Sequence, residues 1–149
     1  MKSAHEIVKL VGHEAASDVA RDGLLKFAVR LLKQEREHYH WVGIYLLEGE
    51  ELVLHNFVGK PTEHTNIAIG TGVCGIAVAE GANQIIGDVT KLDNYLACSM
   101  ETRSEIVVLI RRGERIFGQI DIDSDVENAF SEEDESLLTR VADVLAARF

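Results

Sequence analysis

Cysteine and proline are scarce in this sequence of 149 residues, which contains two cysteines, Cys74 and Cys98, and one proline, Pro61. Two cysteines are too few for the disulfide framework of a small secreted domain. They do not form a Cys-x-x-Cys pair, so their spacing predicts no zinc site. In a chain of this length we expect either packed thiols or redox-active groups.

Long apolar runs and an excess of positive charge are also missing. No run approaches the roughly 18 apolar residues of a membrane span. His5, Glu6 and Lys9 interrupt the region where a signal peptide needs an unbroken apolar stretch. Fifteen basic against 25 acidic residues give a formal net charge of −10, which disfavours nucleic acids and anionic membranes as partners. The sequence therefore predicts a soluble, cytoplasmic protein that binds neither.

Two enzyme signatures are absent as well. The sequence contains no GxxxxGK[ST] phosphate-binding loop and no GxSxG nucleophile turn, so P-loop and α/β-hydrolase chemistry have no support. His38 and His40 stand close together, but no acid or cysteine follows at ligand spacing. We interpret both as residues at a helix end, and we expect neither a metal nor an organic cofactor.

Hydrophobic periodicity predicts helices at both ends of the chain. Apolar residues three and four positions apart predict a helix over 18–37, with Ser17 or Asp18 as its N-cap, and a weaker pattern covers 3–14. A closing helix begins after Ser131, where the residue three positions later completes an approximate capping box.

The middle of the chain is typical of strands and loops. Two antiparallel hairpins are expected, over 41–58 and 104–123. The residues between them are expected to form an irregular segment, a short helix, a short strand and a long loop, over 59–72, 73–81, 83–87 and 88–103. This order predicts a single α+β domain over 1–149, with a mainly antiparallel sheet and a helical segment over 1–37.

The two cysteines each allow two interpretations. Cys98 lies in the expected long loop, where a small molecule can reach a thiol and Arg103 would favour the thiolate. It is equally a small buried apolar residue, as most free cysteines are. Cys74 lies near the start of the short helix, which lowers a thiol pKa, but the local pattern favours core packing for it.

Three acids form the most informative polar pattern. Asp121 and Asp123 alternate with apolar residues, so a strand places both on one face, and Glu105 on the preceding strand can lie opposite them. Like charges on one face require solvent, a cation or a shared proton. Either the face is a solvated edge, or the acids surround a pocket in which at least one carboxyl pKa is raised.

Two aromatic residues show a similar pattern. Trp41 and Tyr45 are four positions apart in the first expected strand, so both rings lie on one face of the sheet. They form either one wall of a pocket or part of an ordinary core.

Several segments together resemble the GAF domains and, more narrowly, the free-methionine-(R)-sulfoxide reductases. The segments that carry the resemblance are GTGVCGIAV, YLACSMETRSEIVV, GQIDIDS, the strand WVGIY and the helix start SEEDESLL. The resemblance runs over roughly 38–146. It implies a central antiparallel sheet with the terminal helices on one face and a pocket under loops on the other.

The resemblance also implies a reaction and the residues that carry it. Cys98 corresponds to the nucleophile, which attacks the sulfur of free methionine sulfoxide and becomes a sulfenic acid. A thiol resolves this acid to a disulfide, which a thioredoxin-type donor reduces. The pocket acids, which supply a proton and hold the substrate ammonium, correspond to Glu105, Asp121 and Asp123. The aromatic residues that pack the S-methyl group correspond to Trp41 and Tyr45.

The chain departs from the family pattern at one position. Many members carry a third cysteine shortly after the Gly-Lys of the loop, and at that spacing this chain has His64. Resolution then falls to Cys74 or to an external thiol. The departure keeps open a non-catalytic GAF module that binds a small molecule or senses redox state. GAF domains often pair through their terminal helices, so a homodimer is expected.

Overall fold

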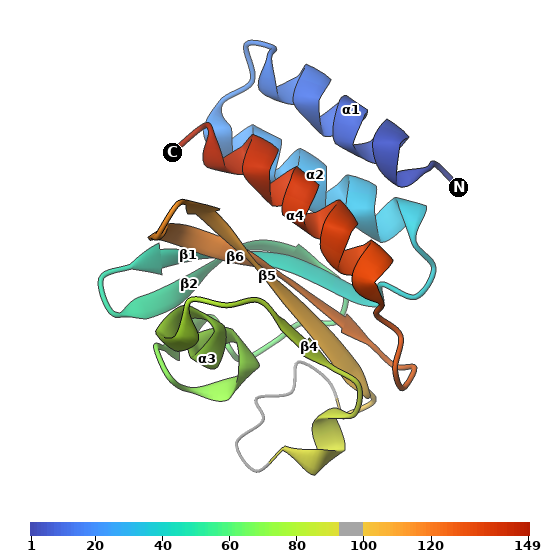
Figure 1. Ribbon diagram of the computed structural model, residues 1–149, viewed down its shortest axis with the longest axis vertical. Helices are drawn as coiled ribbons and strands as arrows, with labels where there is room; N and C mark the ends of the chain where they lie inside the picture. Colours follow the sequence, from blue (N-terminus) through green and yellow to red (C-terminus); the bar gives the residue numbers. More distant parts are fainter. Residues whose placement is uncertain (93–99) are drawn as a thin grey trace.

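The computed structural model describes residues 1–92 and 100–149. Figure 1 shows a curled sheet with three helices on one face and a shorter helix on the other. The helices are α1 (Ala4–Ala15), α2 (Arg21–Glu35), α3 (Gly72–Glu80) and α4 (Glu132–Ala146). The strands are β1 (Trp41–Glu48), β2 (Glu51–Val58), β3 (Asn66–Ala68), β4 (Gln84–Ile86), β5 (Ser104–Arg112) and β6 (Arg115–Ser124).

The sheet confirms the predicted α+β class and both hairpins. Its strand order is β3-β2-β1-β6-β5-β4, and all neighbours are antiparallel. The pairing of β1 with β6 joins the two hairpins at the centre of the sheet. Strand β3 lies within the segment expected to be irregular, because three residues are too few to show alternation. A short 3-10 helix, Val89–Lys91, begins the expected loop.

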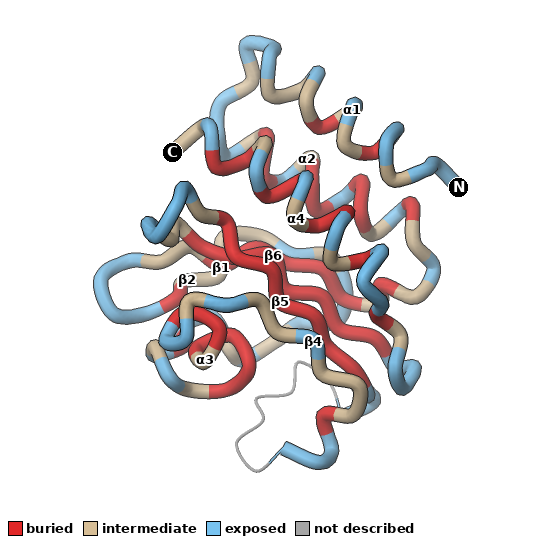
Figure 2. The backbone as a smooth tube through the Cα atoms, in the orientation of Figure 1, coloured by how far each residue is buried: buried red, intermediate tan, exposed pale blue. Residues whose placement is uncertain are grey.

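The terminal helices cover one face of the sheet and enclose the main core. Helices α2 and α4 pack on the sheet, and α1 packs on both of them (Figure 1). Figure 2 shows buried residues along the central strands and on the facing helix sides. The strand residues on this face are Val42, Ile44, Ile106, Val108, Ile110, Ile120 and Ile122. Ile7 and Val11 of α1 are fully buried, so the apolar side of this helix packs into the core of its own chain.

The ends of the helices test the capping predictions. Helix α4 begins with the predicted capping box, in which Asp134 accepts from the Ser131 amide. Helix α2 has Ala20 as its N-cap, with no side-chain bond, so the prediction of Ser17 or Asp18 is wrong. The Ser17 hydroxyl instead donates to the Glu14 carbonyl at the end of α1. No helix in the described ranges is both long and apolar enough to cross a membrane.

Candidate functional site

The three acids lie together on the face of the sheet opposite the terminal helices. The register of β5 and β6 pairs Glu105 with Asp123 and places Asp121 two residues further along. The three are only 3%, 2% and 1% exposed, respectively. The solvated-edge interpretation is therefore wrong, and the acids are buried side by side on neighbouring strands.

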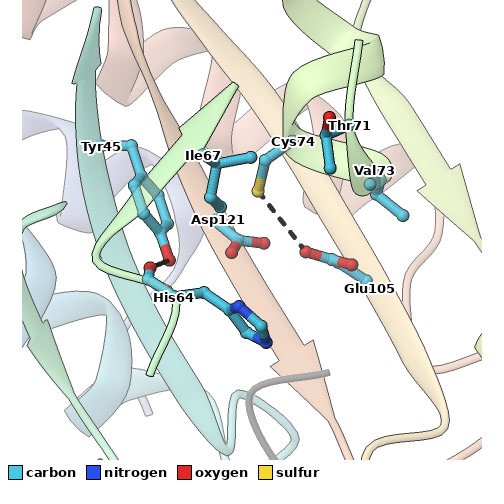
Figure 3. A pocket seen from close by; sticks show the side chains of 9 residues that line it. Tyr45, His64, Ile67, Thr71, Val73, Cys74, Glu105 and Asp121 are labelled. Atoms are coloured by element: carbon cyan, nitrogen blue, oxygen red, sulfur yellow. Dashed lines mark hydrogen bonds between the residues drawn. The ribbon is translucent and has the colours of Figure 1, made fainter. Parts of the chain in front are cut away.

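Helix α3 brings Cys74 against these acids. The helix approaches the preceding turn closely, because a Cβ on Gly75 would lie 2.4 Å from the Ala68 carbonyl oxygen. The Gln119 amide of β6 donates to the Cys74 carbonyl at 3.0 Å and ties the helix to the sheet. The Cys74 Sγ donates to Glu105 Oε2 at 3.8 Å (Figure 3).

The electrostatics of this group follow from burial. Burial raises the pKa of Glu105 well above its ordinary range, and the nearby Asp121 and Asp123 raise it further. Burial also raises the pKa of Asp121, although hydrogen bonds with Glu105 and Cys74 oppose the change. At least one carboxyl of the group therefore keeps a proton near neutral pH.

The Cys74 thiol is packed, as the local sequence pattern favours. Its residue is 5% exposed, and burial, followed by the charges of Asp121 and Glu105, raises its pKa well above the ordinary thiol value. Burial and the nearby acids thus outweigh the lowering of the thiol pKa that is expected near the start of a helix. The sequence did not indicate that this thiol and the acids meet.

A small cavity lies where α3 meets the acids. Its volume is about 10 Å³, which is close to what one water molecule requires. Asp121 is one of its lining residues, and the Oδ1 atom of Asp121 is buried and accepts no hydrogen bond from the described part of the chain. The cavity is lined by Tyr45, His64, Ile67, Thr71, Gly72, Val73, Cys74, Glu105 and Asp121 (Figure 3).

Trp41 and Tyr45 share one face of β1, as predicted, and both are buried. Their ring centroids are 6.4 Å apart, and Phe57 of β2 stacks on Trp41 at 5.5 Å. The Trp41 indole donates to the Lys60 carbonyl at 3.0 Å. The indole also crosses Gly43, where a Cβ would lie 2.4 Å from the ring. Trp41 is therefore held in one orientation from several sides.

A larger cavity lies beside Trp41, and Asp123 forms part of its wall. Its volume is about 210 Å³, enough for a small ligand. Its described lining consists of His40, Trp41, Lys60, Thr102, Asp123 and Asp125. Asp121 and Asp123 are two positions apart on one strand face, so β6 supplies one acid to each cavity.

Sequence reasoning missed several residues of this lining. Lys60 and Thr102 lie in segments without periodicity, and Phe57 could be placed against Trp41 only with the register of the β1–β2 hairpin. The interpretation of His40 as a helix-end residue is wrong, because α2 ends at Glu35 and His40 lines the larger cavity. Its position directly before Trp41 was the available signal.

Cys98 and a glycine-rich turn are two further features of the sequence. Cys98, the implied nucleophile, lies outside the described residues, so its position is not tested. Residues 70–75 have the Gly-x-Gly-x-x-Gly spacing of a dinucleotide-binding turn. That turn belongs to a parallel βαβ unit, whereas the strands on both sides of α3, β3 and β4, pair only in antiparallel fashion.

Comparisons with known proteins identify the family of the chain. The GAF domain family model matches residues 22–149. The free methionine-R-sulfoxide reductase of Escherichia coli is 41% identical over 111 residues, which cover 74% of this chain and 67% of that protein.

Two solved structures are similar over nearly the whole chain. The type II free methionine-R-sulfoxide reductase of Thermoplasma acidophilum is 40% identical with a TM-score of 0.81, and the match covers 93% of this chain and 94% of that one. The Neisseria meningitidis enzyme, solved in complex with its substrate, is 35% identical with a TM-score of 0.91, over 98% of this chain and 87% of that one. By its sequence and its fold, the chain belongs to the GAF domain family.

Proposed function

We propose that this protein reduces free methionine (R)-sulfoxide to methionine with thiols as the source of electrons. The observation that carries the proposal is the meeting of a thiol and three buried acids beside an aromatic-walled cavity. The similarity to proteins named free methionine-R-sulfoxide reductases, one of them solved with its substrate, supports the same activity. The R epimer rests on this similarity alone.

The larger cavity suits a free amino acid. Asp123 and Asp125 offer carboxylates to an ammonium group, while Lys60 offers a cation to a carboxylate. The Trp41 ring offers an apolar surface to the S-methyl group, and Tyr45, deeper on the same face, completes the aromatic wall. A residue inside a peptide lacks the free ammonium group that these acids would hold, so the substrate is the free amino acid.

The proposed chemistry begins at Cys98. Its thiolate attacks the sulfoxide sulfur, and a protonated carboxyl among Glu105, Asp121 and Asp123 gives its proton to the sulfoxide oxygen. The oxygen passes to Cys98, so methionine leaves reduced by two electrons and Cys98 becomes a sulfenic acid. Thr102, only four residues away, lines the larger cavity, and four residues span at most about 14 Å.

The cycle closes by thiol exchange. The Cys74 thiol condenses with the sulfenic acid, water leaves, and a disulfide forms. A thioredoxin-type dithiol then reduces this disulfide. Cys74 is the resolving thiol within the chain because His64 occupies the position where many relatives carry a third cysteine.

We further propose that the protein acts in the cytoplasm as a homodimer. Light scattering that gives a single monomer peak would rule out the dimer.

A second function is favoured by the burial of Cys74. A thiol that is 5% exposed, with a raised pKa, suits a GAF module that binds the amino acid without turning it over. The two functions differ in their need for Cys98. The enzyme loses activity with Cys98→Ser, whereas a binding module keeps its ligand.

The test is turnover of separate R and S epimers of free methionine sulfoxide by the reduced protein. Methionine is measured with a small dithiol and with thioredoxin, for the wild type, Cys98→Ser and Cys74→Ser. We expect R-specific turnover that Cys98→Ser abolishes. Cys74→Ser should retain activity with the dithiol and lose it with thioredoxin. No methionine from fully reduced wild type, together with measurable binding of the sulfoxide, would replace the enzyme by the binding module.

A further inference from the structure

The buried group of Cys74, Glu105 and Asp121 has the geometry of a metal site. One Sγ and two carboxylate oxygens lie within 4.8 Å of one another. The Sγ of Cys74 is 3.8 Å from Glu105 Oε2. Tetrahedral Zn²⁺, with Zn–S of about 2.3 Å and Zn–O of about 2.0 Å, separates such atoms by about 3.5 Å. The ligand atoms therefore need only small movements to coordinate an ion.

A separate observation indicates that the group has room for a guest. Asp121 lines the small cavity, and its buried Oδ1 atom has no hydrogen-bond partner in the described ranges. A buried carboxylate oxygen without a partner costs free energy. The cavity, at about 10 Å³, holds one water-sized guest, so a single ion fits where a larger ligand does not.

The charges around the cavity favour a cation. Two acids, Glu105 and Asp121, line it, and its described lining includes no lysine or arginine. The residues Glu105, Asp121 and Cys74 come from β5, β6 and α3, which are packed together by the core of this sheet face. His64 lines the same cavity (Figure 3). A divalent cation would offset the mutual repulsion of the acids.

We propose that Cys74, Glu105 and Asp121 form a binding site for a thiophilic divalent cation, with Zn²⁺ as the ion that fits them. A thiolate with two carboxylates is a soft and hard ligand set that Zn²⁺ accepts, whereas Mg²⁺ and Ca²⁺ prefer oxygen alone. Three protein ligands leave the fourth position of a tetrahedral ion open. If the proposed function holds, Zn²⁺ and methionine sulfoxide exclude one another, because the ion occupies acids that the reaction needs.

The experiment measures metal binding without substrate. Reduced, chelator-stripped protein is titrated with Zn²⁺ against a chromophoric chelator, and with Co²⁺ to follow the thiolate-to-cobalt charge-transfer absorption. We expect one ion per chain and the thiolate band in the wild type. Asp121→Asn and Cys74→Ser should weaken binding by at least the ~10–100-fold that loss of even an outer partner costs. Cys74→Ser should also lose the band.

Two controls separate this site from others. Cys98→Ser removes the other thiol and should keep the band and the affinity. His55→Ala removes a pair between β2 and α2, in which His55 Nε2 lies 2.9 Å from Asp22 Oδ1, and should change neither. Absence of binding in the wild type, a band that persists in Cys74→Ser, or a band lost in Cys98→Ser overturns the proposal. Circular dichroism checks folding, and Asp121→Asn decides the outcome if Cys74→Ser does not fold.

Inhibition is tested separately from binding. Single turnover by prereduced protein is followed with and without Zn²⁺, because a dithiol donor would itself chelate the ion. We expect Zn²⁺ to raise the sulfoxide concentration needed for half-maximal rate. Zinc binding by a protein that reduces no sulfoxide would reject the proposed function and retain the metal site. Turnover by a protein that binds no Zn²⁺ would reject the metal site and retain the proposed function.

Discussion

Two buried aspartates on opposite sides of the sheet differ in the direction of their carboxyl pKa shifts. Asp134, at the start of α4, accepts from Tyr39 Oη at 2.6 Å and from the Ser131 amide at 2.9 Å, and lies 3.1 Å from His38 Nε2. Burial opposes its ionised form, but these hydrogen bonds together outweigh burial and lower its pKa. Asp121 is more deeply buried, and its pKa is raised.

The difference lies in the partners. Each oxygen of Asp134 is satisfied, so this carboxylate joins α4 to the start of β1 and serves the fold. Asp121 has an oxygen without a partner among the described residues and faces two more acids. A buried carboxyl that lacks partners lowers the stability of the fold, and such a group is retained where a bound ligand supplies the missing partner. The comparison therefore separates a structural acid from a functional one without reference to any relative.

The largest expected effect is the loss of the structural acid. Asp134→Ala removes the capping box and leaves the buried Tyr39 hydroxyl unsatisfied, so we expect a loss of about 3 kcal/mol in the free energy of unfolding. Urea unfolding measures it. The matched control is Asp143→Ala on the exposed side of the same helix, expected within about 0.5 kcal/mol of wild type. Equal effects of the two substitutions would remove the distinction.

The functional acid should respond with the opposite sign. Asp121→Asn replaces one of three neighbouring buried acids by a neutral amide, so we expect a gain of about 1 kcal/mol in stability at neutral pH. Turnover of methionine sulfoxide should fall by roughly 100-fold or more, the usual contribution of a positioned acid. Parallel unfolding and single-turnover measurements test both. A loss of stability comparable to that of Asp134→Ala would place Asp121 with the structural acids.

The pH dependence of stability should distinguish the same two groups. The pKa of Asp134 is lower in the folded chain, so its stabilisation is present above the unfolded carboxyl pKa and is lost as pH falls through the folded pKa. The pKa of Glu105 is higher in the folded chain, so its favourable contribution is greatest at low pH and is lost as pH rises toward the folded pKa.

Two neutral variants measure these slopes. Relative to wild type, the deficit of Asp134→Asn should shrink on acidification, and the advantage of Glu105→Gln should grow as pH rises from the ordinary carboxyl range. Urea unfolding over a pH series gives both curves. Parallel curves for the two variants would contradict the opposite pKa shifts.

Local sequence patterns predicted the positions of these acids in the fold, whereas tertiary contacts determined which groups they meet. Alternation along β6 placed Asp121 and Asp123 on one face, and Ser131 with its acid indicated the cap of α4. The approach of Cys74 to the acids depends on the close packing of Gly75 against Ala68 and on the Gln119 amide, which reaches Cys74 from a strand 45 residues away. The same holds for Tyr39 and His38, whose partner Asp134 is about 95 residues away. Cys98 remains a prediction from the resemblance alone.

The smallest expected effect is that of removing one hydrogen-bond donor from Asp134. Tyr39→Phe removes the hydroxyl that donates to Asp134 but leaves no buried donor without an acceptor, so we expect a loss of only about 1 kcal/mol. The Asp134 pKa should rise toward its ordinary value, because its lowering depends partly on this bond. Unfolding and NMR titration of the carboxyl measure the two changes. An unchanged carboxyl pKa would show that His38 and the Ser131 amide alone hold Asp134 ionised, and that the contrast with Asp121 does not depend on Tyr39.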